Sequence, residues 1–125
     1  MILLDTNIVI NMINNHDNKN WDLLSTEDVV ICGIVVAELY RGIKNNKERK
    51  AVDLFVNSLD SLNPDVRDWI DIGLFIANLK KRGLTIPFQD AVIAFLAIKN
   101  NCNLLTDDKH FSLIFEVDNR IKLFC

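Results

Sequence analysis

The first ten residues, MILLDTNIVI (1–10), contain an apolar run that is interrupted by Asp5, Thr6 and Asn7 and then resumes. A short apolar run that ends at turn-forming residues is typical of a strand covered on both faces of a sheet. We therefore predict a buried strand over residues 1–4, with the carboxylate of Asp5 at its end. The simpler interpretation of Asp5 is that it only begins a turn, as Asp often does.

Short strands and helices alternate along the rest of the chain. Segments 14–19 and 45–50 are predicted to be a polar loop and a charged connector. The other elements follow from short apolar runs and from apolar residues at helical spacing. Strands are predicted over residues 29–32, 104–106 and 121–124, and helices over residues 8–12, 34–43, 51–62, 66–82, 88–100 and 109–115. This alternation predicts an α/β fold with a parallel sheet.

Composition limits the class of protein. The 125 residues fit one domain, and 50% are hydrophobic and 25% charged, as in globular proteins. The three cysteines form no C-x-x-C pair, so neither a disulfide framework nor a zinc site is indicated and a reducing compartment is expected. No apolar run reaches the about 20 residues that a membrane helix needs. We therefore expect a cytoplasmic protein without membrane contact.

Several acidic residues are predicted to gather at one edge of the sheet. Ligands of open parallel sheets bind beyond the carboxyl ends of the strands, where Asp5 and the pair Asp107 and Asp108 follow two predicted strands. Glu38 and Asp90 lie in helices that are expected to border the same edge. Crowded ionised carboxylates require a cation, and ligands that are all oxygen predict a hard one, Mg²⁺ or Mn²⁺.

Each of these acids also has a simpler interpretation. Asp90 in a first helical turn complements the helix dipole, and Glu38 is a solvated helix residue. One of Asp107 and Asp108 is expected to belong to the loop alone. The sequence leaves open which of these two joins the acidic cluster.

Four segments carry a resemblance to a known family: LLDTN (3–7), VVAELYRG (35–42), IPFQDAVIA (86–94) and LLTDDKHF (104–111). In this order and spacing they resemble the PIN-domain nucleases, and more narrowly the VapC-type toxins of bacterial and archaeal toxin–antitoxin pairs. The resemblance extends from residue 1 to about 124. It implies a single PIN domain over 1–125, with a three-layer α/β/α architecture and a short central parallel sheet.

The resemblance also implies roles for individual residues. The acidic quartet is matched by Asp5, Glu38, Asp90 and Asp108, since the fourth acid of the family stands two residues after the Thr. Metal ligands are then Asp5, Asp90 and Asp108, with Glu38 and Asp107 as additional candidates, and the polar support around them is Thr6, Asn7 and Thr106. No role in acid–base catalysis is assigned to His110, because neither the family pattern nor a visible partner supports one, and a surface histidine is the simpler interpretation.

The activity implied by the resemblance is metal-dependent endoribonuclease cleavage, in which a divalent cation activates water against an RNA phosphodiester. The products would carry 5′-phosphate and 3′-hydroxyl ends. A homodimer and a small antitoxin protein are the implied partners. The sequence leaves open the RNA target, the antitoxin and the choice between one and two metal ions.

A local basic segment is the candidate contact for RNA. The net charge of −3 argues against indiscriminate polyanion binding, so any contact is expected to be local. Residues 41–50 hold five basic residues and one acid. Arg41 and Lys44 are predicted to contact RNA phosphates, and a solubilising loop is the simpler interpretation.

Two other functions compete with the nuclease. A PIN-like binding module that cleaves nothing would keep the scaffold, although all four acidic positions are filled. An Asp-dependent phosphatase is disfavoured, because that chemistry places a second Asp two residues after the first, where this chain has Asn7.

Overall fold

The computed structural model describes residues 1–124 and contains one five-stranded parallel sheet with the strand order β3-β2-β1-β4-β5. The central strand β1 pairs on one side with β2 and on the other with β4. The strands are β1 (Ile2–Leu4), β2 (Val29–Cys32), β3 (Asp60–Leu62), β4 (Asn103–Leu105) and β5 (Lys122–Leu123). The predicted α/β class with a short parallel sheet is confirmed.

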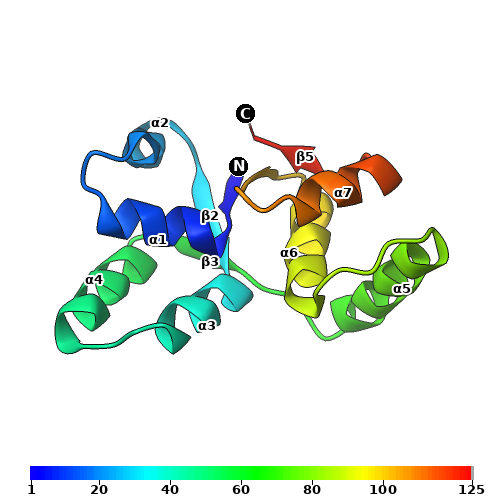
Figure 1. Cartoon of the computed structure of the whole chain (residues 1–125), viewed down its shortest axis with the longest axis horizontal. Coiled ribbons are helices and arrows are strands. Elements are labelled where there is room, and N and C mark those ends of the chain that lie inside the picture. Colours follow the sequence, from blue (N-terminus) through cyan, green and yellow to red (C-terminus); the bar gives the residue numbers. More distant parts are fainter. Residues whose placement is uncertain (125) are drawn as a thin grey trace.

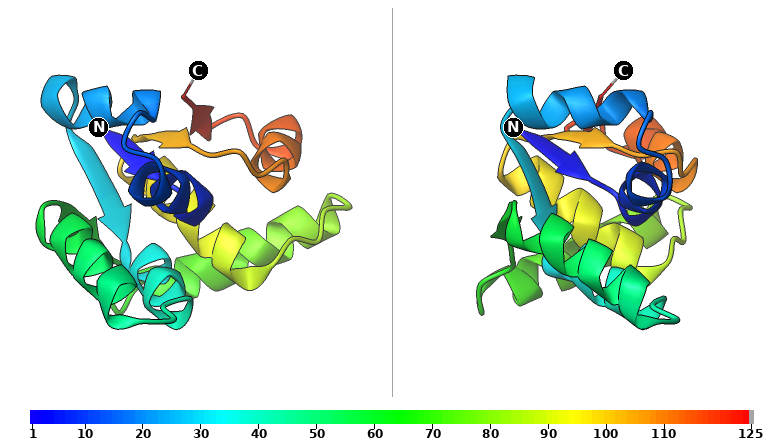
Figure 2. Two further views of the ribbon diagram at one scale, coloured as in Figure 1. Left: turned by 60° about the vertical axis from the view of Figure 1, so that its left-hand side comes forward. Right: turned by 90° about the vertical axis from the view of Figure 1, so that its left-hand side faces the viewer.

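Helices lie on both sides of this sheet (Figure 1). One group consists of α1 (Thr6–Asn14), α3 (Gly33–Arg41) and α4 (Asn46–Asn57), which pack against one another. The other group consists of α5 (Asp68–Lys81), α6 (Phe88–Lys99) and α7 (His110–Val117), in which α6 contacts both neighbours. A 3₁₀ turn, η1 (Lys19–Asp22), and α2 (Leu23–Thr26) connect α1 to β2. Figure 2 shows the same three layers from two further sides.

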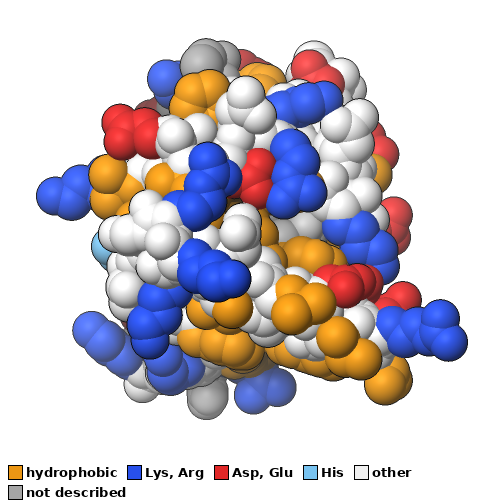
Figure 3. All heavy atoms as spheres, turned by 90° about the vertical axis from the view of Figure 1, so that its right-hand side faces the viewer, with side chains coloured by type: hydrophobic (Ala, Val, Ile, Leu, Met, Phe, Trp, Pro, Cys, Tyr) orange, Lys and Arg blue, Asp and Glu red, His pale blue; other side chains and the backbone are white. Residues whose placement is uncertain are grey.

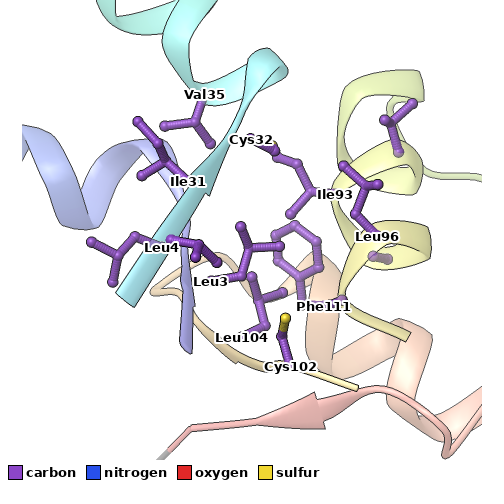
Figure 4. Packing of buried hydrophobic residues seen from close by; sticks show 14 of the residues in the cluster. Leu3, Leu4, Ile31, Cys32, Val35, Ile93, Leu96, Cys102, Leu104 and Phe111 are labelled. Carbon is purple, nitrogen blue, oxygen red and sulfur yellow. The ribbon is translucent and has the colours of Figure 1, made fainter. Parts of the chain in front are cut away.

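The core follows from the alternation of side chains along the strands. Leu3 and Leu104 project toward α6, where Ile93 meets them, whereas Leu4 lies on the side of α1 and α3 (Figure 4). All of these side chains are buried. Helix α6 is buried almost all round, because its alanines allow close packing between the sheet and α5. Of the described helices, none is both long enough and apolar enough to cross a membrane.

The predicted helix over 51–62 is wrong at both ends. Helix α4 already begins at Asn46, because the Asn45 side chain accepts a hydrogen bond from the Glu48 backbone N–H at 2.9 Å. The predicted connector over 45–50 is therefore mostly helical. Residues Asp60–Leu62 form β3 instead, which pairs with β2 at the edge of the sheet. Its polar residues carry no apolar run that would predict a strand.

The sheet brings three strand ends to one edge. Because β1, β2 and β4 are parallel neighbours, their carboxyl ends point the same way. Asp5 follows β1, Gly33 begins α3 directly after β2, and Thr106 follows β4. Asp5 and the acids of segment 104–111, Asp107 and Asp108, therefore lie at or just beyond this edge of the sheet.

Candidate active site

Asp5 is held by groups from two neighbouring elements. Its Oδ1 accepts a hydrogen bond from the Thr6 backbone N–H at 2.8 Å, so that the residue caps α1. Its Oδ2 accepts a hydrogen bond from the Thr106 hydroxyl at 2.6 Å, and its backbone N–H donates to the Leu105 carbonyl at 3.0 Å. The side chain is buried, and these contacts fix its position at the end of β1.

Glu38 is joined to the same place by a second threonine. The Thr6 hydroxyl donates to Glu38 Oε1 at 2.8 Å. The other carboxylate oxygen, Oε2, lies 3.6 Å from the guanidinium of Arg41, one helical turn further along α3. The two threonines, Thr6 and Thr106, therefore connect Glu38, Asp5 and the segment after β4.

Asp90 and Asp108 meet around a histidine. The Nδ1 atom of His110 lies 2.8 Å from Asp90 Oδ2 and 3.2 Å from Asp108 Oδ1. Asp108 is also oriented through its backbone N–H, which donates to the Thr106 hydroxyl at 2.9 Å. Ligand atoms of these three residues lie within 4.8 Å of one another, and no other such group of three occurs within residues 1–124. Asp5 and Glu38 border this group without being part of it.

The charges of these acids act on one another. Burial raises the pKa of Asp5, and the charges of Asp108 and Glu38 raise it further, against the hydrogen bonds from Thr106 and Thr6. Burial likewise raises the pKa of Asp90, with contributions from Asp108 and Asp5, while His110 opposes them. The edge of the sheet therefore gathers negative charge that solvent only partly stabilises.

The other residues predicted for the site lie outside this network. Asn7 is exposed in the first turn of α1, and its side chain makes no hydrogen bond within the described residues. Asp107 is exposed and lines a separate cavity beside α1, whereas its neighbour Asp108 turns toward Asp90. Lys44 is exposed and uses its backbone N–H to bind the carboxylate of Glu48 at 2.8 Å.

Sequence reasoning missed His110. The sequence shows no partner for this histidine, whereas in the structure its half-exposed ring contacts two acids, one of them 20 residues away on α6. The spacing Asp-x-His at 108–110 is the signal that indicates its proximity to Asp108. The contact with Asp90 requires the packing of α7 against α6.

The donor set fits a divalent cation. The ligand atoms that lie within reach of one ion are two carboxylates, those of Asp90 and Asp108, and the Nδ1 of His110. Asp5 borders this group, and its charge acts on Asp90. Carboxylate oxygens and imidazole nitrogens are both ligands of divalent cations. Arg41 is the one Lys or Arg whose side chain forms an ion pair with an acid of this cluster in the described chain, and it binds the outer oxygen of Glu38. A bound cation would relieve the repulsion that raises the pKa values of Asp5 and Asp90.

A comparison with protein families agrees with this geometry. The model of the PIN domain matches residues 2–115. This chain belongs to the PIN-domain family. The acids of the four quoted segments therefore lie within a matched PIN domain.

Individual relatives of this PIN domain are named as VapC ribonucleases. "Ribonuclease VapC2" of Rickettsia felis is 31% identical over 121 residues, which cover 90% of this chain and 90% of the relative. "Ribonuclease VapC1" of Methanocaldococcus jannaschii is 30% identical over 121 residues, which cover 96% of this chain and 85% of the relative.

Solved structures resemble this PIN domain over its whole length. The structure of VapBC2 from Rickettsia felis bound to a promoter DNA fragment superposes with a TM-score of 0.79 at 27% identity, covering 99% of this chain and 98% of that chain. VapBC-1 from nontypeable Haemophilus influenzae also gives a TM-score of 0.79, at 28% identity, with 99% and 97% covered.

The raised pKa of Asp90 predicts how its removal affects stability without metal. A carboxylate whose pKa rises on folding above the ordinary 3.8 opposes folding once it ionises, so the cost is absent in acid and grows as the pH rises. Asp90→Asn should therefore unfold in EDTA at the same or higher urea concentration than the parent at pH 7. The advantage should shrink toward pH 4.

The matched control is Asp71→Asn, an exposed acid in the first turn of α5. It should change the urea midpoint little at either pH. If Asp90→Asn instead loses about 1 kcal/mol or more at pH 7, the carboxylate serves the start of α6, as in the simpler interpretation.

Proposed function

We propose that this chain is a metal-dependent endoribonuclease and the toxin of a toxin–antitoxin pair. The observation that carries the proposal is the gathering of four acids at one edge of the sheet: Asp5, Glu38, Asp90 and Asp108. The Thr6 and Thr106 hydroxyls bond Glu38, Asp5 and the Asp108 backbone, and His110 joins Asp90 to Asp108. Support comes from relatives named as ribonucleases and from solved structures of VapBC proteins.

The proposed cofactor is Mg²⁺ or Mn²⁺, held by Asp5, Asp90 and Asp108, with Glu38 at the border of the site. When bound, such a cation lowers the pKa of a coordinated water and neutralises charge on the scissile phosphate. The water oxygen forms the new bond to phosphorus while the bond from phosphorus to the 3′ oxygen breaks. The water gives up one proton and the 3′ oxygen takes one, so that the products carry 5′-phosphate and 3′-hydroxyl ends.

The chain's own residues supply orientation. Each threonine hydroxyl fixes one carboxylate by donating to it, Thr6 to Glu38 and Thr106 to Asp5. His110 holds Asp90 and Asp108 together from the other side through one ring nitrogen. Such supporting contacts keep the acids in one arrangement, so that little reorganisation is needed when the substrate binds.

Arg41 is the proposed first contact for the RNA backbone. Its side chain is 76% exposed, yet its guanidinium lies 3.6 Å from Glu38 at the border of the acidic cluster. Lys44 follows it in the segment between α3 and α4. A cation in this place attracts a phosphate that the acids alone would repel.

The proposed partners are a small antitoxin and a second copy of the chain. The antitoxin rests on the VapBC structures that this chain resembles. The homodimer is supported by an apolar stripe at four-residue spacing on α5 and just before it, formed by Val66, Ile70 and Leu74, which are 87%, 68% and 64% exposed. Figure 3 shows hydrophobic side chains gathered on this side of the molecule. Exposed patches of this kind mark interaction sites.

Removal of the metal or of Asp5 should abolish cleavage. With Mn²⁺ or Mg²⁺ the purified protein, freed of any bound inhibitor, should cut single-stranded RNA, and EDTA should stop it. Asp5→Asn should lower the cleavage rate at least about a hundredfold, because loss of a residue that only supports a metal ligand costs less than that. Gel analysis of end-labelled RNA measures the rate, and Asp71→Asn is the control. Cleavage that survives both treatments contradicts the proposal, and complete inactivity of the parent favours a binding module.

Asp108 and Asp107 should differ in their effect. Asp108 contacts His110 and shares the cluster with Asp90, whereas Asp107 is exposed and turned away. Asp108→Asn should therefore reduce Mn²⁺ affinity and cleavage about as strongly as Asp5→Asn, while Asp107→Asn should retain Mn²⁺ affinity. Calorimetric titration of Mn²⁺ into both variants compares them directly. If Asp107→Asn lost Mn²⁺ affinity and Asp108→Asn kept it, the fourth acid of the site would be Asp107.

Arg41 and Lys44 should control the salt dependence of RNA binding. Replacing both with Ala should raise KM and reduce the slope of log affinity against log salt by about 0.7 for each lost phosphate contact. The matched control replaces Lys80 and Lys81, two exposed lysines in the last turn of α5. A slope that the first pair leaves unchanged would show that segment 41–50 only solubilises the protein.

The stripe on α5 should determine the oligomeric state. Ile70→Glu places a charge in its centre and should convert a dimer to a monomer, because burial of an unpaired charge opposes association. Sedimentation velocity in the absence of antitoxin measures the mass, and Leu54→Glu, at a 76% exposed position on α4, is the control. A monomeric parent, or an Ile70→Glu dimer, would contradict this interface.

A further inference from the structure

A cavity lined by four asparagines, the amide cavity, lies beside the acidic cluster. Its volume is about 790 Å³. It lies between α1, the loop that leads into η1, and the ends of β4 and β5. The acids Asp5, Glu38, Asp90 and Asp108 do not line it, so it is distinct from the proposed metal site.

The cavity and the acidic cluster share one wall. Thr106 lines the cavity, and the same side chain donates to Asp5 Oδ2 at 2.6 Å and accepts from the Asp108 N–H at 2.9 Å. Asp107, the residue between Thr106 and Asp108, also lines it. A substrate whose phosphate sits at the acids therefore has a neighbouring group within reach of this cavity.

Charge decides which part of a nucleotide fits. Among residues 1–124, Lys19 is the one basic residue that lines the cavity, and the carboxylates of Asp17 and Asp107 also line it. A phosphate would meet net repulsion there. The cavity therefore suits a neutral group that forms hydrogen bonds, with a preference for groups that donate them.

Four asparagines supply hydrogen-bonding groups around the rim. Asn15 and Asn18 each use Oδ1 to accept a backbone N–H of the loop, from Asp17 at 3.0 Å and from Asn20 at 2.9 Å. Their amino groups remain available. Asn11 and Asn20 also line the cavity, and their side chains have no hydrogen-bond partner within residues 1–124. Such carboxamides pair with the donor and acceptor edge of a nucleobase.

The apolar part of the lining suits a flat ring. Ile8, Leu23 and Leu105 lie among the cavity residues together with Phe124, whose ring stacks on no other aromatic ring of the described chain. Bases of single-stranded RNA are bound by stacking on aromatic side chains combined with hydrogen bonds to their edges. Both kinds of group are present here.

We propose that this amide cavity binds the base of the nucleotide next to the scissile phosphate and gives cleavage its sequence preference. The proposal rests on the proposed ribonuclease function. The carboxylates of Asp17 and Asp107 accept hydrogen bonds, so bases with an exocyclic amino group are preferred, adenine foremost, because a carboxamide also pairs with two atoms of its edge. Uracil is the disfavoured base, because it has no exocyclic amino group and presents two carbonyl oxygens on either side of its N3–H.

Nucleoside binding tests the cavity without any cleavage. Neutral adenosine and uridine are titrated into ¹⁵N-labelled protein in EDTA, and amide chemical shifts are followed by NMR. Adenosine should shift the signals of Asn18, Asn20 and Phe124 at lower concentration than uridine. The double variant Asn11→Ala/Asn20→Ala should lose the shifts of Asn18 and Phe124. The control Asn57→Ala/Asn78→Ala, at two exposed positions elsewhere, should retain all three shifts. A dispersed spectrum of each variant establishes folding.

Cleavage preference provides the second readout. On RNA with random sequence, the parent with Mn²⁺ should cut next to adenine about tenfold more often than next to uracil, and the Asn11→Ala/Asn20→Ala protein should bring this ratio close to one. Absence of adenosine shifts at the cavity, or an unchanged ratio in the double variant, overturns the proposal. A parent that binds adenosine at the cavity but cuts no RNA contradicts the proposed function and leaves the base site supported.

Discussion

The buried carboxylate of Asp5 is the feature on which the rest of the site depends. A charged group at the end of a central strand is costly unless hydrogen bonds or opposite charges compensate for lost hydration. Here the compensation comes from the Thr6 N–H at the start of α1 and from the Thr106 hydroxyl beyond β4. Satisfying this one group therefore joins α1, β1 and β4 at a single point.

The other acids place further negative charge beside Asp5, and this repulsion opposes folding. The pKa values of Asp5 and Asp90 are raised by burial and by their acidic neighbours, and carboxylates perturbed in this way are frequent at functional sites. The apolar core between β1, β4 and α6 provides the stability that permits this arrangement. A cation that binds only the folded state would return part of that stability by mass action.

The fold was predictable from the sequence where burial is strong. Apolar runs indicate β1 and β2, and α6 follows from an apolar segment bounded by Pro87. Strand β3 escaped prediction because an edge strand with Asp60 and Ser61 needs no apolar residues. The segment of η1 and α2 also lacks any apolar period, and its position is set by the loop asparagines and by packing.

The acids of the site were predictable as candidates from their places in the chain. Asp5 and Asp108 come after strands, and Asp90 lies in the first turn of a helix. Glu38 lies within the helix that follows β2. The network of these acids was not predictable, since it depends on contacts between distant residues, such as Thr6 with Glu38 and His110 with Asp90. The cavity beside α1 was not predictable either. The sequence predicts only a polar loop over residues 14–19, and in the structure this loop forms one wall of the cavity.

The most direct test of a shared metal site is anomalous diffraction from crystals soaked in Mn²⁺. We predict one or two anomalous peaks at the carboxyl edge of β1 and β4, with ligands from Asp5, Asp90 and Asp108. An occupied Mn²⁺ site elsewhere on the molecule, with these three carboxylates free of metal, would contradict the central claim.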